Sequence, residues 1–301
     1  MEPTKSIWMD GELIPWAEAT VHVLSHGLHY GTGVFEGIRA YDNDDGTAVF
    51  RLRDHMARLL VSAGAYSMPI ETSLDDLVTA VRETVVANEL ASCYIRPITF
   101  YETGTIGLNP SGARLRTAIV AFAWGAYLGE EGLRNGIRVK ISPWARISPL
   151  SFPAAKATGP YINSVLANQE ATREGFDEAL LLTADGNVSE GAGENLFLVK
   201  DGKVMTPPLS DGCLAGITRE SVMTLLADDD CPVVEKSILP DDLFAADELF
   251  FTGTAAEVTP IREVDDRPIG EPGPITRRAQ ELFRDAVGGK LEQYREWLDY
   301  V

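Results

Sequence analysis

Residues 152–161 read Phe-Pro-Ala-Ala-Lys-Ala-Thr-Gly-Pro-Tyr, and residues 189–195 read Ser-Glu-Gly-Ala-Gly-Glu-Asn. Lys156 stands among alanines, and lysine is scarce in this chain, with seven among the 26 basic residues. A lysine in apolar company loses hydration, which favours its neutral, nucleophilic amine. Such an amine is what a Schiff base requires. An ordinary lysine lies on a solvated surface, whereas this setting between proline and glycine breakers predicts a reactive one.

The composition is that of an acidic globular protein. The chain has 301 residues, 45% of them hydrophobic, and a prior of about 150 residues per domain predicts two domains. The net charge of −19 leaves no basic stripe for phosphate, so we expect no nucleic-acid partner. No apolar run approaches the roughly 18 residues of a membrane span, and no secretory signal precedes the first strand. We therefore expect a cytoplasmic protein with no membrane partner.

Cysteine and histidine spacing predicts no metal site. The three cysteines are widely separated and form no CxxC pair, so neither a disulfide framework nor a zinc site is expected. His22, His26 and His29 recur at helical spacing and resemble a ligand cluster, but no carboxylate or cysteine stands nearby. We expect structural histidines near a site entrance.

Hydrophobic periodicity predicts short strands interleaved with helices, which favours a mixed α/β (α+β) fold over a doubly wound one. No GxGxxG motif follows a strand, so a dinucleotide-binding fold is not expected. Residues 125–136 contain four glycines and little periodicity, which is typical of a linker. The predicted domains are therefore 1–124 and 137–301. The clearest expected elements are a hairpin at 6–13, strands at 92–101 and 116–124, helices from Asp54 and from Thr72 or Ser73, helices at 161–173, 216–227 and 274–287, and a hairpin turning at Asp201-Gly202.

Both opening stretches resemble the core of the class IV pyridoxal-phosphate enzymes, and the branched-chain aminotransferases match best. The resemblance runs from about residue 7 to 301. It is carried by YGTGVFEGIR at 30–39, YIRP at 94–97, WGAYLG at 124–129, the lysine stretch, SEGAGEN at 189–195, GITR at 216–219 and GTAAEVTP at 253–260. It implies a two-domain fold-type IV enzyme, with a small N-terminal domain, a larger C-terminal domain and the cofactor between them.

Pyridoxal 5′-phosphate needs a lysine, a partner for its ring nitrogen, a partner for its phenolate oxygen and a phosphate receptor. Lys156 is the catalytic lysine, and Tyr161, otherwise a core aromatic, is the candidate for the phenolate oxygen. Glu190 is the candidate for the ring nitrogen; Glu194 is the rival, and the family pattern favours the first glutamate.

The candidate phosphate receptor has three parts. Gly216, Ile217 and Thr218 stand at a predicted helix start, where free N–H groups and the helix dipole favour an anion. Thr254 offers a hydroxyl from a strand-end loop, and Arg58 lies on a predicted helix of the first domain. Each is a common feature alone; the joint occurrence with the lysine stretch indicates a cofactor site.

The resemblance also implies a substrate pocket that accepts both branched side chains and the γ-carboxylate of glutamate. Arg96 with Tyr30 and Tyr127 would take the γ-carboxylate. Tyr94 and the amides of Thr254 and Ala255 would take the α-carboxylate. The complete candidate set is Tyr30, Phe35, Arg39, Tyr94, Arg96, Ile106, Leu108, Tyr127, Thr254 and Ala255. The loop with Ile106 and Leu108 would reach in from a partner subunit, which implies a homodimer at least; a homohexamer is the larger alternative.

The expected activity is transfer of the amino group of L-leucine, L-isoleucine or L-valine to 2-oxoglutarate. Within the same fold the alternatives are a D-amino-acid transaminase, an (R)-amine transaminase and an aminodeoxychorismate lyase, and the fold alone does not choose among them. A binding or assembly protein that keeps the scaffold without the cofactor is a further alternative. The intact Lys156, Tyr161, Glu190 and Arg58 argue against it.

Overall fold

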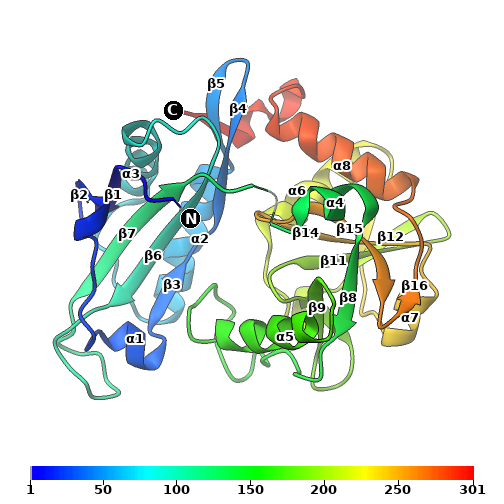
Figure 1. Ribbon diagram of the computed structural model, residues 1–301, viewed down its shortest axis with the longest axis horizontal. Coiled ribbons are helices and arrows are strands. Elements are labelled where there is room, and N and C mark those ends of the chain that lie inside the picture. The colour runs from blue at the N-terminus through cyan, green and yellow to red at the C-terminus, as the bar shows by residue number, and fades with distance from the viewer. Residues whose placement is uncertain (1, 126) are drawn as a thin grey trace. The chain divides into compact units, whose positions relative to one another are not determined.

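The computed structural model describes residues 2–125 and 127–301, which divide into two compact units, each with its own sheet (Figure 1). Unit 1 comprises the chain up to Trp124 together with Pro153–Pro160 and Val287–Val301. Unit 2 comprises Gly125–Phe152 and Tyr161–Ala286. The sequence-based boundaries treat 137–301 as one stretch, whereas two later segments of the chain belong to unit 1.

Unit 1 is built on an antiparallel sheet with the strand order β17-β5-β4-β6-β7-β1-β2, in which β3 also pairs with β6. The C-terminal strand β17 pairs with β5. The strands are β1 (Ser6–Met9), β2 (Glu12–Pro15), β3 (Gly33–Phe35), β4 (Ile38–Asn43), β5 (Gly46–Phe50), β6 (Cys93–Tyr101), β7 (Leu115–Phe122) and β17 (Leu298–Tyr300). The helices are α1 (His26–Tyr30), α2 (Leu52–Ala65) and α3 (Leu74–Ala87), with 3₁₀ turns at Trp16–Glu18 and Glu292–Trp297.

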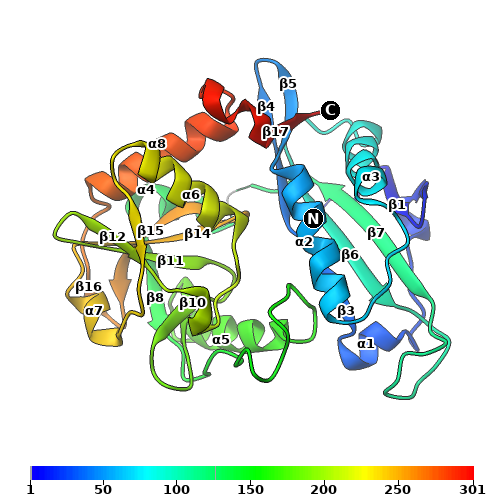
Figure 2. The ribbon, with the colours of Figure 1, turned by 180° about the vertical axis from the view of Figure 1, so that it is seen from behind.

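Helices α2 and α3 cover one face of this sheet (Figure 2). Their buried residues Met56, Leu59, Leu77 and Val81 join the strand residue Ile95 in one apolar core. The Ser73 hydroxyl accepts a hydrogen bond from the Asp76 amide, which confirms the predicted start of α3. Helix α2 begins at Leu52 rather than at Asp54, with Arg51 in the left-handed region before it.

Unit 2 is built on a mixed sheet with the order β10-β9-β8-β15-β14-β11-β12-β13 and β16 beside β15. The pairs β8–β9, β8–β15 and β12–β13 are parallel. The strands are β8 (Ile137–Ile141), β9 (Glu178–Leu182), β10 (Val188–Gly191), β11 (Asn195–Lys200), β12 (Lys203–Thr206), β13 (Val233–Glu235), β14 (Glu248–Gly253), β15 (Glu257–Val264) and β16 (Arg267–Pro268). The helices are α4 (Gly129–Asn135), α5 (Tyr161–Arg173), α6 (Ile217–Asp228), α7 (Pro240–Phe244) and α8 (Pro274–Val287), with a 3₁₀ turn at Leu209–Asp211.

Local sequence explains much of unit 2. Asp201 and Gly202 both have positive φ angles of 49° and 72°, the geometry of a tight two-residue hairpin turn, as predicted. Helix α5 packs Ala167 and Ala171 against alternate residues of β9. Helix α5 lies on one side of the sheet, and α6 lies on the other (Figures 1 and 2). Among the described residues, no helix has the length and apolarity to cross a membrane.

Candidate active site

The lysine segment is held against strand β3 of unit 1. The Phe35 amide donates to the Lys156 carbonyl at 3.0 Å, and the Thr158 amide donates to the Gly33 carbonyl at 2.8 Å. From α2, the Ser62 hydroxyl accepts a bond from the Lys156 amide at 3.2 Å. A Cβ at Gly31, whose φ is +64°, would lie 2.6 Å from the Gly159 Cα, so only glycine permits this approach. The segment around Lys156 is therefore held by backbone bonds to Gly33 and Phe35 of β3.

The side chain of Lys156 joins a cluster of candidate substrate residues in the same unit. Its Nζ lies 5.0 Å from the centre of the Phe35 ring, and the Arg96 guanidinium lies 4.8 Å from the same ring. Arg96 also donates to the Tyr94 hydroxyl at 2.9 Å. Phe35 and Tyr94 are buried, so a primary amine and a guanidinium both lie close to one buried aromatic ring.

Arg58 lies beside this lysine segment but binds a carboxylate that the sequence did not single out. Glu36 is fully buried and accepts bonds from Arg58 Nε at 2.7 Å, Arg58 Nη2 at 2.8 Å and His55 Nδ1 at 2.8 Å. Burial alone raises the pKa of Glu36, but Arg58 and His55 outweigh it and lower the pKa to about 2. Burial lowers the pKa of His55, against the opposing effect of Glu36. The triad therefore holds an ionised carboxylate, a guanidinium and a neutral imidazole at pH 7.

Helix α1 positions the loop that carries Ile106 and Leu108. The Tyr30 hydroxyl donates to the Ile106 carbonyl at 2.7 Å, and His26 Nε2 bonds the neighbouring Gly107 carbonyl at 2.9 Å. Ile106 and Leu108 themselves are 59% and 82% exposed. Tyr30 thus contacts the loop rather than Arg96.

The other predicted residues nearby have local partners. His22 Nδ1 accepts from the Leu24 amide, and His29 Nε2 bonds the Val23 carbonyl at 2.9 Å. Arg39, on β4, donates to the Trp124 carbonyl at 3.2 Å.

Glu190 in unit 2 is a buried carboxylate with its own set of donors. One oxygen accepts a bond from Arg146 at 2.6 Å, and the other accepts from the Leu214 amide at 2.8 Å and from Asn195 Nδ2 at 3.2 Å. A register shift between Val188 and Glu190 interrupts the pairing of β10 with β9, and such a bulge re-aims a side chain. The rival Glu194 is also buried, and it accepts from the adjacent Gly193 amide.

The start of helix α6 offers a receptor for an anion. Gly216 is its N-cap residue, and the buried Ile217 and Thr218 form its first turn, whose N–H groups have no partner within the helix. A Cβ at Gly216 would lie 2.0 Å from Asn195 Oδ1, so the close packing requires glycine. Because Asn195 also bonds Glu190, the helix start and that carboxylate are tied together.

The remaining predicted residues of unit 2 lie at element ends. Tyr161 is the partly buried first residue of α5, and Thr254 and Ala255 form the turn between β14 and β15. Tyr127 donates a hydrogen bond to Glu178, a carboxyl whose pKa burial raises. Tyr127 is therefore engaged with β9, in a different unit from Arg96 and Tyr30.

The sequence of this chain is similar to that of a known enzyme family. Residues 33–264 match the family described as amino-transferase class IV. This chain belongs to the class IV aminotransferases. It is 51% identical over 298 residues to a branched-chain-amino-acid aminotransferase of Pseudomonas aeruginosa, covering 98% of this chain and 97% of the relative.

Solved structures agree with that assignment. The branched-chain amino acid aminotransferase of Escherichia coli superposes with a TM-score of 0.96 at 46% identity, covering 98% of this chain and 99% of that one. The T.th. branched-chain amino acid aminotransferase, complexed with N-(5′-phosphopyridoxyl)-L-glutamate, has a TM-score of 0.94 at 44% identity, covering 99% and 98%. The expected mixed α/β class IV fold of this aminotransferase is therefore confirmed.

Sequence reasoning missed three ionisable residues that lie beside candidate site residues in this class IV aminotransferase. Glu36 and His55 surround Arg58, and Arg146 pairs with Glu190. Glu36 had a visible signal, because it is a charged residue with the apolar Val34 and Phe35 before it and Ile38 shortly after it. Arg146 had none, since its partner lies 44 residues further along the chain.

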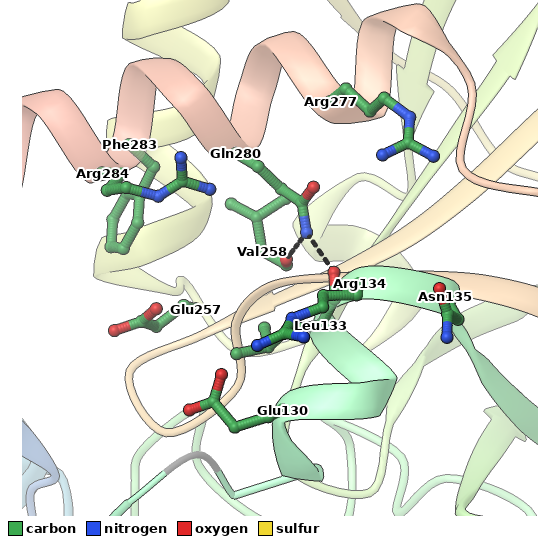
Figure 3. A pocket seen from close by; sticks show the side chains of 10 residues that line it. All are labelled: Glu130, Leu133, Arg134, Asn135, Glu257, Val258, Arg277, Gln280, Phe283 and Arg284. Carbon is green, nitrogen blue, oxygen red and sulfur yellow. Dashed lines mark hydrogen bonds between the residues drawn. The ribbon is translucent and has the colours of Figure 1, made fainter.

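Unit 2 of the aminotransferase also has a pocket of about 560 Å³ between α4, α8 and the start of β15. Gln280 crosses it and donates to the Leu133 and Val258 carbonyls (Figure 3). None of the predicted site residues lines it. Its charged side chains have both signs: Glu130, Arg134, Glu257, Arg277 and Arg284.

Proposed function

We propose that this aminotransferase moves the amino group of L-leucine, L-isoleucine or L-valine to 2-oxoglutarate, giving branched 2-oxo acids and L-glutamate in a ping-pong sequence. The observation that carries the proposal is the position of the Lys156 amine. It lies 5.0 Å from the centre of the Phe35 ring, which Arg96 also approaches, and Arg96 bonds Tyr94; this arrangement supports the pairing of a nucleophile with a receptor for carboxylates. The names of the relatives, at about half identity over almost the whole chain, support it.

The donor set fits pyridoxal 5′-phosphate. The chain supplies a lysine with a fixed backbone, a buried and multiply hydrogen-bonded carboxylate, and a helix start without a side chain at its N-cap. When bound, the cofactor supplies an electron sink that stabilises negative charge at the substrate Cα. The residues proposed to hold it are Arg58, Lys156, Tyr161, Glu190, Gly216, Ile217, Thr218 and Thr254.

Lys156 is proposed to act both as the attachment point and as the base. Its Nζ takes the proton from the substrate Cα and gives it up again on the cofactor side, as a positioned general acid–base. Hydrogen bonds that Arg146, Leu214 and Asn195 donate to the two oxygens of Glu190 favour the ionised form of its carboxylate. An ionised acceptor there holds a proton on a pyridine nitrogen.

Substrate binding is proposed to depend on Arg96. The rings of Phe35 and Tyr94 lie 4.8 and 5.2 Å from its guanidinium carbon, so apolar side chains and a charged donor share one wall. Arg96, with Tyr30 and Tyr127, would take the γ-carboxylate of glutamate, and Tyr94 with the Thr254–Ala255 amides would take the α-carboxylate. Phe35 and Tyr161 would contact the branched side chain.

The loop with Ile106 and Leu108 is proposed to reach a second copy of the chain. These two side chains are exposed, and Val23 and Leu28 of the neighbouring α1 region are 67% and 65% exposed. Exposed apolar side chains on neighbouring segments are typical of an interface. We infer a homodimer at least, and a homohexamer is the larger alternative; sedimentation velocity distinguishes the two. The cytoplasmic location stays a prediction from the sequence.

The proposal is tested by steady-state kinetics with a panel of amino donors and 2-oxoglutarate. L-leucine, L-isoleucine and L-valine are expected to react, with little turnover of D-alanine or (R)-1-phenylethylamine. Arg96→Met should raise KM for 2-oxoglutarate by about 10-fold or more, because a charge-assisted bond is lost, with a smaller effect on L-leucine. Arg134→Met, an exposed arginine of the pocket in Figure 3, is the matched control and should change neither. Preferential use of D-alanine or the (R)-amine would overturn the substrate assignment.

A further inference from the structure

Unit 1 buries three polar groups where an apolar core would cost less. Glu36 is 0% exposed and His55 1% exposed, and the Arg58 side chain is 16% exposed. Removing such charges from water carries a large desolvation penalty, and well-packed apolar residues are often as stable or more stable in their place. The network therefore calls for an explanation beyond stability.

The geometry of the network fixes the orientation of one side chain. Arg58 donates Nε to one Glu36 oxygen at 2.7 Å and Nη2 to the other at 2.8 Å. Two parallel bonds define the plane of a guanidinium as well as its position. His55 Nδ1 lies 2.8 Å from the same carboxylate, and because an ionised carboxylate only accepts, the imidazole is the donor. The hydrogen bond from His55 thus restrains the orientation of the Glu36 carboxylate.

The same elements hold the reactive lysine. Arg58 and Ser62 lie four residues apart on one face of α2, and Ser62 accepts the Lys156 amide bond. Glu36 directly follows Phe35, whose amide donates to the Lys156 carbonyl. A shift of Glu36 would therefore move Arg58 relative to the lysine segment.

We infer that Glu36, supported by His55, is a positioning residue that orients the Arg58 guanidinium toward the phosphate group of the cofactor. This inference rests on the proposed function, in which Arg58 belongs to the phosphate receptor. Neither Glu36 nor His55 touches the reacting atoms. Their effect is to hold the Arg58 guanidinium, a hydrogen-bond donor to the phosphate, in one plane.

The test compares binding of pyridoxal 5′-phosphate with binding of pyridoxal, which lacks the phosphate, to the full-length protein freed of cofactor. Dissociation constants come from absorbance titration, so no turnover is needed. Arg58→Met should raise the dissociation constant of pyridoxal 5′-phosphate by about 10-fold or more, because it loses hydrogen bonds between charged groups. The dissociation constant of pyridoxal should not change. Glu36→Gln should also raise the dissociation constant of pyridoxal 5′-phosphate and not that of pyridoxal. The increase should be smaller than in Arg58→Met, because the Arg58 guanidinium remains but is no longer held in one orientation.

Two further variants keep the test decisive. Glu248→Gln removes another buried carboxylate with three hydrogen bonds, in unit 2, and should leave the ratio of the two constants unchanged. His55→Phe keeps the Glu36–Arg58 pair and should moderately raise the ratio of the dissociation constant of pyridoxal 5′-phosphate to that of pyridoxal. If Glu36→Gln does not fold, this variant tests the positioning role in its place.

The outcomes separate the two proposals. If Glu36→Gln leaves the ratio of the two dissociation constants unchanged while Arg58→Met raises it, the positioning role of Glu36 is wrong. The assignment of Arg58 to the phosphate then survives. An unchanged ratio in His55→Phe likewise overturns the part given to the histidine. If Arg58→Met itself shows no selectivity for the ester, the phosphate assignment falls.

Discussion

The packing of Gly37 against Tyr94 makes a sharp prediction for the substrate wall. A Cβ at Gly37 would lie 2.1 Å from the Tyr94 hydroxyl oxygen and 3.0 Å from its ring. Since non-bonded heavy atoms prefer a separation of about 3.5 Å, the Gly37→Ala variant must move that hydroxyl by more than about 1 Å. The movement breaks or lengthens its 2.9 Å bond to Arg96.

Two quantities should change in Gly37→Ala. Overpacking of a buried site costs about 1–3 kcal/mol in the free energy of unfolding, which urea titration measures. Displacement of a substrate-binding group by about 1 Å lowers kcat/KM by up to about 100-fold, and the loss should affect L-leucine and L-glutamate alike, because Tyr94 is proposed to bind the shared α-carboxylate.

Gly64→Ala is the matched control, because a Cβ at this position of α2 meets nothing within 4 Å. It should leave kcat/KM unchanged and stabilise the protein by about 0.5–1 kcal/mol through helix propensity. Wild-type kcat/KM in Gly37→Ala would refute the assignment of Tyr94 to the substrate.

Three further predictions concern buried groups. Arg58 and His55 hold the pKa of Glu36 at about 2, so the contribution of its carboxylate to stability should be complete above pH 4.5, the ordinary pKa, and lost as the pH falls toward 2. Carbon-13 NMR should show no protonation of Glu36 between pH 7 and 4. A titration midpoint near 4.5 would contradict the network. Burial raises the pKa values of Cys93 and Cys213 to about 12, so a disulfide reagent at pH 8 should modify neither thiol until urea unfolds the protein; rapid reaction in the native state is the contrary result. Glu248→Ala should lower the free energy of unfolding by about 1–3 kcal/mol, since its carboxylate accepts bonds from the first turn of α8; an unchanged urea midpoint would show that this cap contributes nothing.

Local signals in the sequence predicted local structure well. The cap at Ser73, the turn at Asp201–Gly202 and the limits of α5 and α8 follow from residues close together in the chain. Capping, turn geometry and helical periodicity are decided within a few residues.

Pairing between distant segments could not be predicted in this way. The sequence gives no local sign that Leu298–Tyr300 pairs with Gly46–Phe50, or that Lys156 joins the strand at Phe35. For the site, family motifs identified the class and drew attention to Lys156, Arg58 and Glu190. They did not show the ion pairs with Glu36 and Arg146, because such partners are chosen by the folded arrangement.

The central claim is that Lys156 carries pyridoxal phosphate and passes the amino group of a branched L-amino acid to it. The most direct measurement is a half-reaction, in which the yellow protein is mixed with L-leucine without acceptor while its absorbance spectrum is recorded. We predict conversion to the pyridoxamine form, reversed by 2-oxoglutarate, and no conversion at a comparable rate in Lys156→Ala. A spectrum that L-leucine leaves unchanged but D-alanine or an (R)-amine converts would contradict the substrate assignment. Failure to bind pyridoxal phosphate at all would contradict the function.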